Sequence, residues 1–143
     1  KPLVARKSIY EIKERTDADG RVSVPVDTEE IRRLAKSLTG KYDSIAVCFI
    51  NSYLNSENEE RAAAVLREEL DKSVMVITSA ETAREWREYE RTSTTVLNAY
   101  VSPITKAHLP RPISSTSPKP NVVTTAQFAP FRSITAFKPD VVP

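Results

Sequence analysis

The side chains with the most reactive chemistry in this sequence are one thiol and one imidazole, at Cys48 and His108. Cys48 lies inside the continuous apolar run of residues 45–50, and a thiol among apolar groups has a raised pKa and packs as a small hydrophobe. His108 stands beside a proline-rich segment that begins at Pro110, where no ordered partner can be named to orient its ring. Zinc needs several such ligands converging on one point. The sequence therefore predicts no catalytic cysteine or histidine and no metal site.

Carboxylates are numerous enough to supply pairs for acid–base chemistry. They gather at residues 57–60 and 81–90, where arginines are interleaved with them at helical spacing. Glutamate and arginine three or four positions apart pair on the surface of a helix, so both clusters favour solvated helix faces over catalytic pairs. Asp17, Asp19 and Gly20 resemble the start of a calcium loop, but the spacing to the glycine is wrong, and a hairpin turn is the better interpretation.

The most unusual stretch is ERTSTTVLNAYVSP at residues 90–103, in which four hydroxyl residues follow one another. Such residues compete with the backbone for hydrogen bonds and suit the start of a helix better than its interior. Two interpretations remain open. One is a capped junction between helices. The other is a surface that faces a ligand or another domain, with Arg91, Thr94 and Asn98 as its polar groups.

The composition limits the classes of protein that need to be considered. The chain has 143 residues, of which 40% are hydrophobic and 28% charged, and its net charge is +2. These values are typical of one water-soluble domain and do not indicate nucleic acid as a partner. No apolar run is long enough to span a membrane, and a single cysteine favours a reducing, cytoplasmic setting. The only glycines, Gly20 and Gly40, are too few for a glycine-rich phosphate loop.

The elements that would position these residues follow from hydrophobic periodicity and turn residues. Strands alternate with helices after an initial hairpin, and Asp27 and Gly40 bracket the first helix as N-cap and C-cap. The order is β-β-α-β-α-β-α, which predicts an α/β fold with parallel strands. The expected strands are residues 8–15, 21–24, 45–50 and 74–77, and the expected helices are residues 28–39, 56–71 and 80–102. The last stretch could be one helix or two consecutive helices, and Pro103 should end it.

The segment after Pro103 differs in composition from the rest. It holds seven of the ten prolines and only one of the 19 acidic residues, Asp140. Prolines at this density stop helices and remove donors from strands. We therefore expect two parts, an ordered unit at residues 1–103 and an irregular or disordered, proline-rich tail at residues 104–143.

Several stretches in the same order resemble the hydantoinase A / oxoprolinase family. They are the turn at residues 14–20, the strand and "NSY" at 45–53, the helix start at 55–61, the approach at 79–89 and the 90–103 stretch. Together they cover about residues 3–103, as an internal part of the family's N-terminal domain. The RTSTTVLNAYVSP sequence is more similar to the N-methylhydantoinase and acetone-carboxylase-subunit branch than to the 5-oxoprolinase branch.

This resemblance implies a partial ribonuclease-H-like, actin-like ATPase fold. It also implies that ATP, with a divalent metal, activates and opens a cyclic amide such as hydantoin or 5-oxoproline, or activates a ketone for carboxylation. Two departures matter. The glycine-rich phosphate-binding segment that normally precedes this region is missing, so we expect a fragment that is inactive alone. The histidine usual in the family before Glu59 is Asn58 here.

A second hypothesis needs no catalysis. The α/β unit would be a non-enzymatic interaction module whose tail binds a partner through Phe128, Phe131 and Phe137. Under the first hypothesis the partners are a cyclic amide and a missing subunit or a second copy of the chain, because the missing first strands would leave sheet edges uncovered.

Overall fold

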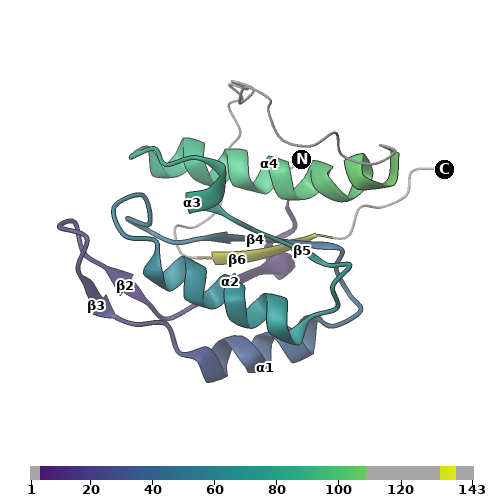
Figure 1. The fold of residues 1–143 in the computed structure, drawn as a ribbon, viewed down its shortest axis with the longest axis horizontal. Helices are drawn as coiled ribbons and strands as arrows, with labels where there is room; N and C mark the ends of the chain where they lie inside the picture. Colours follow the sequence, from purple (N-terminus) through teal and green to yellow (C-terminus); the bar gives the residue numbers. More distant parts are fainter. Residues whose placement is uncertain (1–3, 109–132, 138–143) are drawn as a thin grey trace.

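The computed structural model describes residues 4–108 and 133–137. These residues form an α/β unit in which α1 and α2 cover one face of a four-stranded sheet and α3 and α4 lie on the other face (Figure 1). In chain order the elements are η1 (Arg6–Ser8), β1 (Ile9–Glu11), β2 (Arg15–Thr16), β3 (Val22–Val24), α1 (Thr28–Leu38), β4 (Ser44–Cys48), α2 (Glu57–Glu69), β5 (Met75–Thr78), α3 (Ser79–Thr82), α4 (Glu88–His108) and β6 (Ser133–Phe137).

The main sheet has the strand order β1-β6-β4-β5. β4 and β5 run parallel, in register from Ser44 opposite Met75 to Val47 opposite Thr78, and α2 makes the crossover between them. All five residues of β4 are buried, as expected for a strand covered on both faces. The α/β class and the parallel pair predicted from the sequence are therefore confirmed.

The initial hairpin is shorter than predicted. Only β2 pairs with β3, around a turn in which Gly20 has φ +82° and donates its N–H to the Asp17 carbonyl at 2.9 Å. The residues before Ile12 leave the hairpin, and β1 joins the main sheet instead. The expected strand at 8–15 is thus two strands in two sheets, because residues 9–11 pair with β6, and Ile12 between the two strands packs into the core at 5% exposure.

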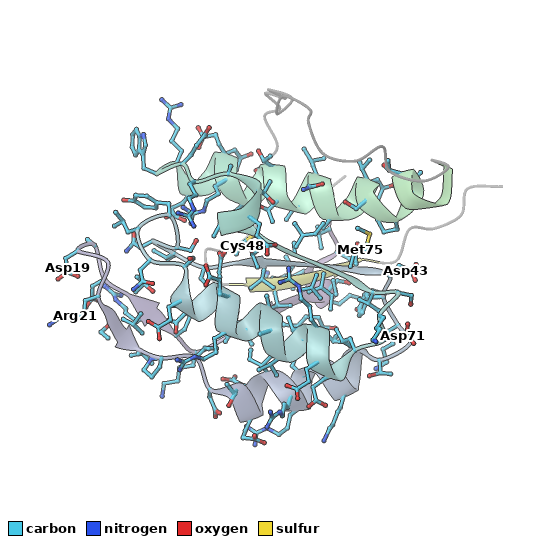
Figure 2. All side chains as sticks on the ribbon, viewed as in Figure 1. Asp19, Arg21, Asp43, Cys48, Asp71 and Met75 are labelled. Carbon is cyan, nitrogen blue, oxygen red and sulfur yellow. The ribbon has the colours of Figure 1, made fainter. Side chains whose placement is uncertain are left out.

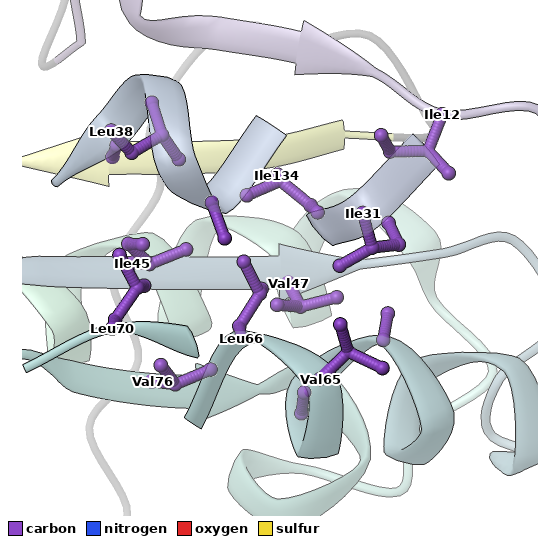
Figure 3. Packing of buried hydrophobic residues seen from close by; sticks show 14 of the residues in the cluster. Ile12, Ile31, Leu38, Ile45, Val47, Val65, Leu66, Leu70, Val76 and Ile134 are labelled. Atoms are coloured by element: carbon purple, nitrogen blue, oxygen red, sulfur yellow. The ribbon is translucent and has the colours of Figure 1, made fainter. Parts of the chain in front are cut away.

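One apolar core fills the space between the sheet and helices α1 and α2. The N-cap Asp27 accepts a hydrogen bond from the Glu29 N–H and starts α1, as predicted, and Gly40 lies just beyond its end with φ +72°. Figure 3 shows Ile31 of α1 and Ile134 of β6 near Val47 of β4. Burying each such side chain contributes about 1.5–3 kcal/mol.

Helix α4 continues five residues beyond Pro103, which corrects the expectation that proline ends it there. A proline inside a helix leaves the carbonyl four residues earlier without its donor. Here that carbonyl belongs to Ala99, and the Ser44 hydroxyl of β4 donates to it at 2.5 Å. A strand side chain therefore replaces the missing backbone hydrogen bond.

Among the described residues, no helix has the length and apolarity to cross a membrane.

β6 corrects the prediction of a wholly irregular tail. Residues 133–137 contain no proline, and they form a strand between β1 and β4, antiparallel to both. The observed order therefore has an additional strand at its end. Of the aromatic residues proposed as a binding surface, Phe137 lies in β6 opposite Ser44, whereas Phe128 and Phe131 lie outside the described residues. The division into parts at residues 1–103 and 104–143 stays a prediction.

Candidate functional site

A cluster of buried polar side chains lies where β4 and β5 end, and we call it the strand-end network. In open α/β sheets, ligands bind beyond the carboxyl ends of parallel strands, which makes this edge the natural place to look for a site. Figure 2 shows Cys48 at this end of β4 and Asp43 near the opposite end. The network consists of Ser52, Glu59, Ser79, Glu88 and Arg91.

Glu59 is the acidic centre of the network. It lies in the first turn of α2 on the face that also carries Ala62, Ala63 and Leu66, and its exposure is 0%. Its Oε1 accepts hydrogen bonds from the Phe49 N–H at 2.7 Å and the Ser79 hydroxyl at 2.6 Å, and its Oε2 accepts from the Ala80 N–H at 3.0 Å. Removal from water raises the pKa of Glu59, against the opposing effect of these donors.

Arg91 is the basic centre, and its exposure is 1%. Its Nε donates to the Ser79 hydroxyl at 3.1 Å, its Nη1 to the Glu85 carbonyl at 3.0 Å and its Nη2 to the Phe49 carbonyl at 2.8 Å. The same Nη2 pairs with the Glu88 carboxylate, and the guanidinium carbon lies 5.6 Å from the centre of the Tyr53 ring. Every nitrogen of the guanidinium therefore has a partner, as a buried charge requires.

The network holds the loop that follows β4. Asn51 in this loop has φ +58°, and among the described residues it alone adopts a positive φ without being glycine. Its backbone N–H donates to Glu88 Oε1 at 3.1 Å, and its side-chain amide donates to the Thr16 carbonyl at 3.0 Å. Asn51 thereby links the β2–β3 hairpin to the start of α4. A non-glycine residue keeps such a conformation only where its surroundings fix it.

The side chains of the strand-end network can hold backbone groups in place, but they cannot act as a nucleophile or as a general base. The Ser79 hydroxyl donates to Glu59, accepts from Arg91 and is 0% exposed, so it has no free access as a nucleophile. Glu59 is 0% exposed and both of its oxygens accept hydrogen bonds from groups within the fold, so a substrate has no access to this carboxylate. The Cys48 thiol is also buried, and desolvation raises its pKa, in agreement with the structural role predicted for it.

Comparison with known proteins places this arrangement in a family. Residues 1–70 match the hydantoinase/oxoprolinase N-terminal region. The chain is also 40% identical over 116 residues to an uncharacterised protein of Methanocaldococcus jannaschii, which covers 80% of this chain and 17% of that protein. The chain belongs to the hydantoinase/oxoprolinase family. The resemblance found in the sequence is confirmed.

Two members of the hydantoinase/oxoprolinase family have solved structures that match the fold. Caprolactamase subunit alpha of Pseudomonas jessenii is 34% identical over 110 residues. The crystal structure of the ATP-dependent caprolactamase from this organism aligns with a TM-score of 0.63 at 34% identity, over 68% of this chain and 14% of that one. A nucleotide-free acetone carboxylase structure aligns with a TM-score of 0.61 at 30% identity, over 67% and 14%. This chain thus spans between 14% and 17% of the length of these relatives.

The three predicted contact residues do not converge. Arg91 points into the strand-end network, Thr94 is half-buried and donates its hydroxyl to the Glu90 carbonyl at 2.8 Å, and Asn98 is exposed and accepts from the Ser102 hydroxyl. Arg91 therefore acts on the loop after β4 in this structure. A role for any of the three residues towards a ligand or another domain stays a prediction.

Sequence reasoning missed Glu59, Ser79 and Asn51. Glu59 was assigned with the other carboxylates of residues 57–60 to a solvated helix face, yet its exposure is 0%. A usable signal existed, because Glu59 stands three, four and seven positions before apolar residues of the buried stripe of α2. The burial of Ser79 and the contacts of Asn51 with Thr16 and Glu88 join segments that are distant in the sequence, so no local signal predicts them.

Asn58, where the hydantoinase/oxoprolinase family usually has histidine, is a structural residue. It is 2% exposed, its Oδ1 accepts from the Val26 N–H at 3.0 Å, and its Nδ2 donates to Glu14 at 2.9 Å and to the Val24 carbonyl at 3.2 Å. The amide thus ties α2 to the segment after the hairpin. All three hydrogen bonds of Asn58 join it to other residues of the α/β unit.

The described residues do not fit the nucleotide and metal that the family implies. Gly20 and Gly40 both occupy turns, and neither opens a helix as a phosphate cradle does. No group of three His, Cys, Asp or Glu side chains in the described part of the chain is arranged to hold a metal ion. No chemical step through ATP follows from these residues.

Proposed function

We propose that this chain is part of an ATP-dependent hydantoinase-type enzyme that opens a cyclic amide of the hydantoin or 5-oxoproline kind, and that it is inactive alone. The parent fold would be ribonuclease-H-like. The observation that carries the proposal is the combined match to ATP-dependent caprolactamase, at 34% identity and a TM-score of 0.63. A lactam is a cyclic amide, so the name of this relative agrees with the proposed substrate class.

The role of the described residues in such an enzyme is to hold one edge of a sheet rigid. Arg91 donates to the Phe49 carbonyl at 2.8 Å, and Glu59 accepts from the Phe49 N–H at 2.7 Å. This fixes the loop after β4, which lies at the edge where α/β folds bind ligands. The residues that react with ATP and substrate would come from other parts of the enzyme.

Partners follow from the same comparison. Caprolactamase subunit alpha carries the word subunit in its name, and this chain spans 16% of its length. We therefore include a second polypeptide, or further segments of the same enzyme, among the expected partners. These other parts of the enzyme would bind the nucleotide.

The test is turnover by the purified chain. It is incubated with ATP, magnesium and each of hydantoin, 5-oxoproline and caprolactam, and both ring opening and phosphate release are measured. Intact caprolactamase is the positive control, and an unrelated domain of equal size is the blank. We expect no turnover above the blank. Ring opening by the chain at a rate comparable to that of caprolactamase would refute inactivity in isolation.

A further inference from the structure

The position of β6 in the sheet bears on whether this strand can be exchanged between copies of the chain. Among the described residues β6 is the last element, yet it lies inside the sheet (Figure 1), with β1 on one side and β4 on the other. It pairs over five positions with β4, from Ser133 opposite Cys48 to Phe137 opposite Ser44, and over three positions with β1. β1 and β4 make no ladder with each other. Between them lies a slot one strand wide.

The slot selects its strand by side-chain size and spacing. Two residues of β6 belong to the core on the side of α1 and α2, namely Ile134 at 0% and Ala136 at 2% exposure. Ile134 stands opposite Val47 and Tyr10, and Ala136 stands opposite Ile45. A strand that enters this slot therefore needs a branched residue and a small residue two positions apart, and backbone bonds to both neighbours supply the remaining attraction.

Charge also favours this segment as the occupant. Residues 133–137 are flanked in the sequence by Arg132 and Lys138. The two strands that line the slot carry Glu11, and Asp43 directly precedes β4. Residues 1–103 have a net charge of −2 and residues 104–143 a net charge of +4, which sum to the +2 of the chain. The segment and the unit that receives it thus attract each other.

The connection between α4 and β6 is long enough to place the strand elsewhere. Residues 109–132 separate the two elements, and a chain of this length reaches at most about 80 Å. The same five residues therefore reach the slot of their own chain or that of a neighbouring copy. Exchange of an identical element between copies needs no new complementarity, because every contact is preserved.

We propose that the slot between β1 and β4 is a strand-acceptor site, and that residues 133–137 of a second copy of this chain occupy it in a strand-exchanged dimer. The monomer is the same sheet closed by its own strand. The proposal concerns assembly and holds whether or not the parent enzyme opens cyclic amides.

The first experiment tests the slot with the full chain carrying Ile134→Pro, which removes both the apolar anchor and a ladder donor of β6. A fluorescent peptide with the sequence of residues 131–139 is the probe, and a scrambled peptide is the control. We expect one-to-one binding to the variant, with new protection of β4 amides from hydrogen exchange. Wild-type chain should bind the probe at least about tenfold more weakly, because its own strand competes at a high effective concentration.

The second experiment tests the second copy. Wild-type chain is refolded from urea at low and at high protein concentration, and its mass is measured by size exclusion with light scattering. We expect a dimer that grows with protein concentration during refolding and is absent for Ile134→Pro. Binding of the probe no better than the scrambled peptide, a variant that stays unfolded with the probe present, or a wild-type chain that remains monomeric throughout would each overturn the proposal.

Discussion

Replacing Arg91 tests whether the strand-end network stabilises the fold. The side chain is 1% exposed and makes three hydrogen bonds to neutral oxygens, at 2.8, 3.0 and 3.1 Å, besides its pair with Glu88. Arg91→Ala removes a donor from each of those oxygens and from the carboxylate. The Ser52 hydroxyl still donates to the Phe49 carbonyl, and the Asn51 N–H still donates to Glu88 Oε1. Removing one partner of a buried ion pair costs about 3–5 kcal/mol, and we expect a loss of this size in the free energy of unfolding.

A lysine at the same position gives a graded result. Its ammonium keeps the charge but lacks the planar fork that reaches several oxygens at once. Arg91→Lys should therefore restore only part of the stability and cost about 2 kcal/mol. Since small domains have about 5–15 kcal/mol in total, the lysine variant remains measurable if the alanine variant falls too low.

Urea unfolding followed by circular dichroism measures both variants, with Arg87→Ala as the matched control. Arg87 also pairs with a glutamate three positions away, Glu90, but its side chain is 59% exposed. An exposed pair contributes at most about 1 kcal/mol, so the control should stay close to wild type. If Arg91→Ala cost no more than Arg87→Ala at an unchanged denaturant slope, the reasoning about the network would be refuted.

Three further predictions concern single contacts. Ser44→Ala should lower the free energy of unfolding by about 1–3 kcal/mol, because the Ala99 carbonyl loses its donor. In a Pro103→Ala background the loss should be smaller, because the new N–H of residue 103 binds that carbonyl. A double-mutant cycle measures this coupling, and equal losses in the two backgrounds would contradict the prediction. Burial raises the pKa of Glu59 above its ordinary value of 4.5, so the folded chain retains a proton that the unfolded chain releases, and the free energy of unfolding falls as pH rises from 4.5 through the raised pKa. Glu59→Gln should flatten this dependence of stability on pH, measured by urea unfolding at several pH values above 4.5. An unchanged pH dependence would count against the prediction. Arg67 donates to the Val76 carbonyl on the edge strand β5 at 2.8 Å and pairs with Glu81, so Arg67→Ala should promote self-association in sedimentation experiments, whereas Arg61→Ala, from an exposed pair away from β5, should not.

Local patterns predicted the elements that depend on local rules. The alternation around Gly20, the cap at Asp27 and the apolar run of β4 each determine their structure within a few residues, and each agrees with the fold. The resemblance over residues 3–103 was likewise visible, because an ordered series of short stretches is far more specific than any one of them.

The predictions were wrong where contacts between segments distant in the sequence determine the structure. Pro103 is tolerated in α4 only because Ser44, 55 positions away from Ala99, donates to the freed carbonyl. β6 forms because β1 and β4 present edges on either side of it. Arg91 and Glu59 were both visible as charged residues in helices, but their burial follows from the packing of α2, α3 and α4 around the ends of β4 and β5, which no local spacing reveals.

The central claim is that the described residues hold a loop in place within an ATP-dependent enzyme and do not themselves react with its substrates. Turnover by a chimera tests this claim most directly. The matching part of caprolactamase subunit alpha is replaced by residues 4–108 of this chain, and ATP-dependent lactam opening is measured on assembled, folded enzyme. The account predicts a kcat within about tenfold of the parent. A chimera that folds and assembles normally yet has no turnover would contradict it.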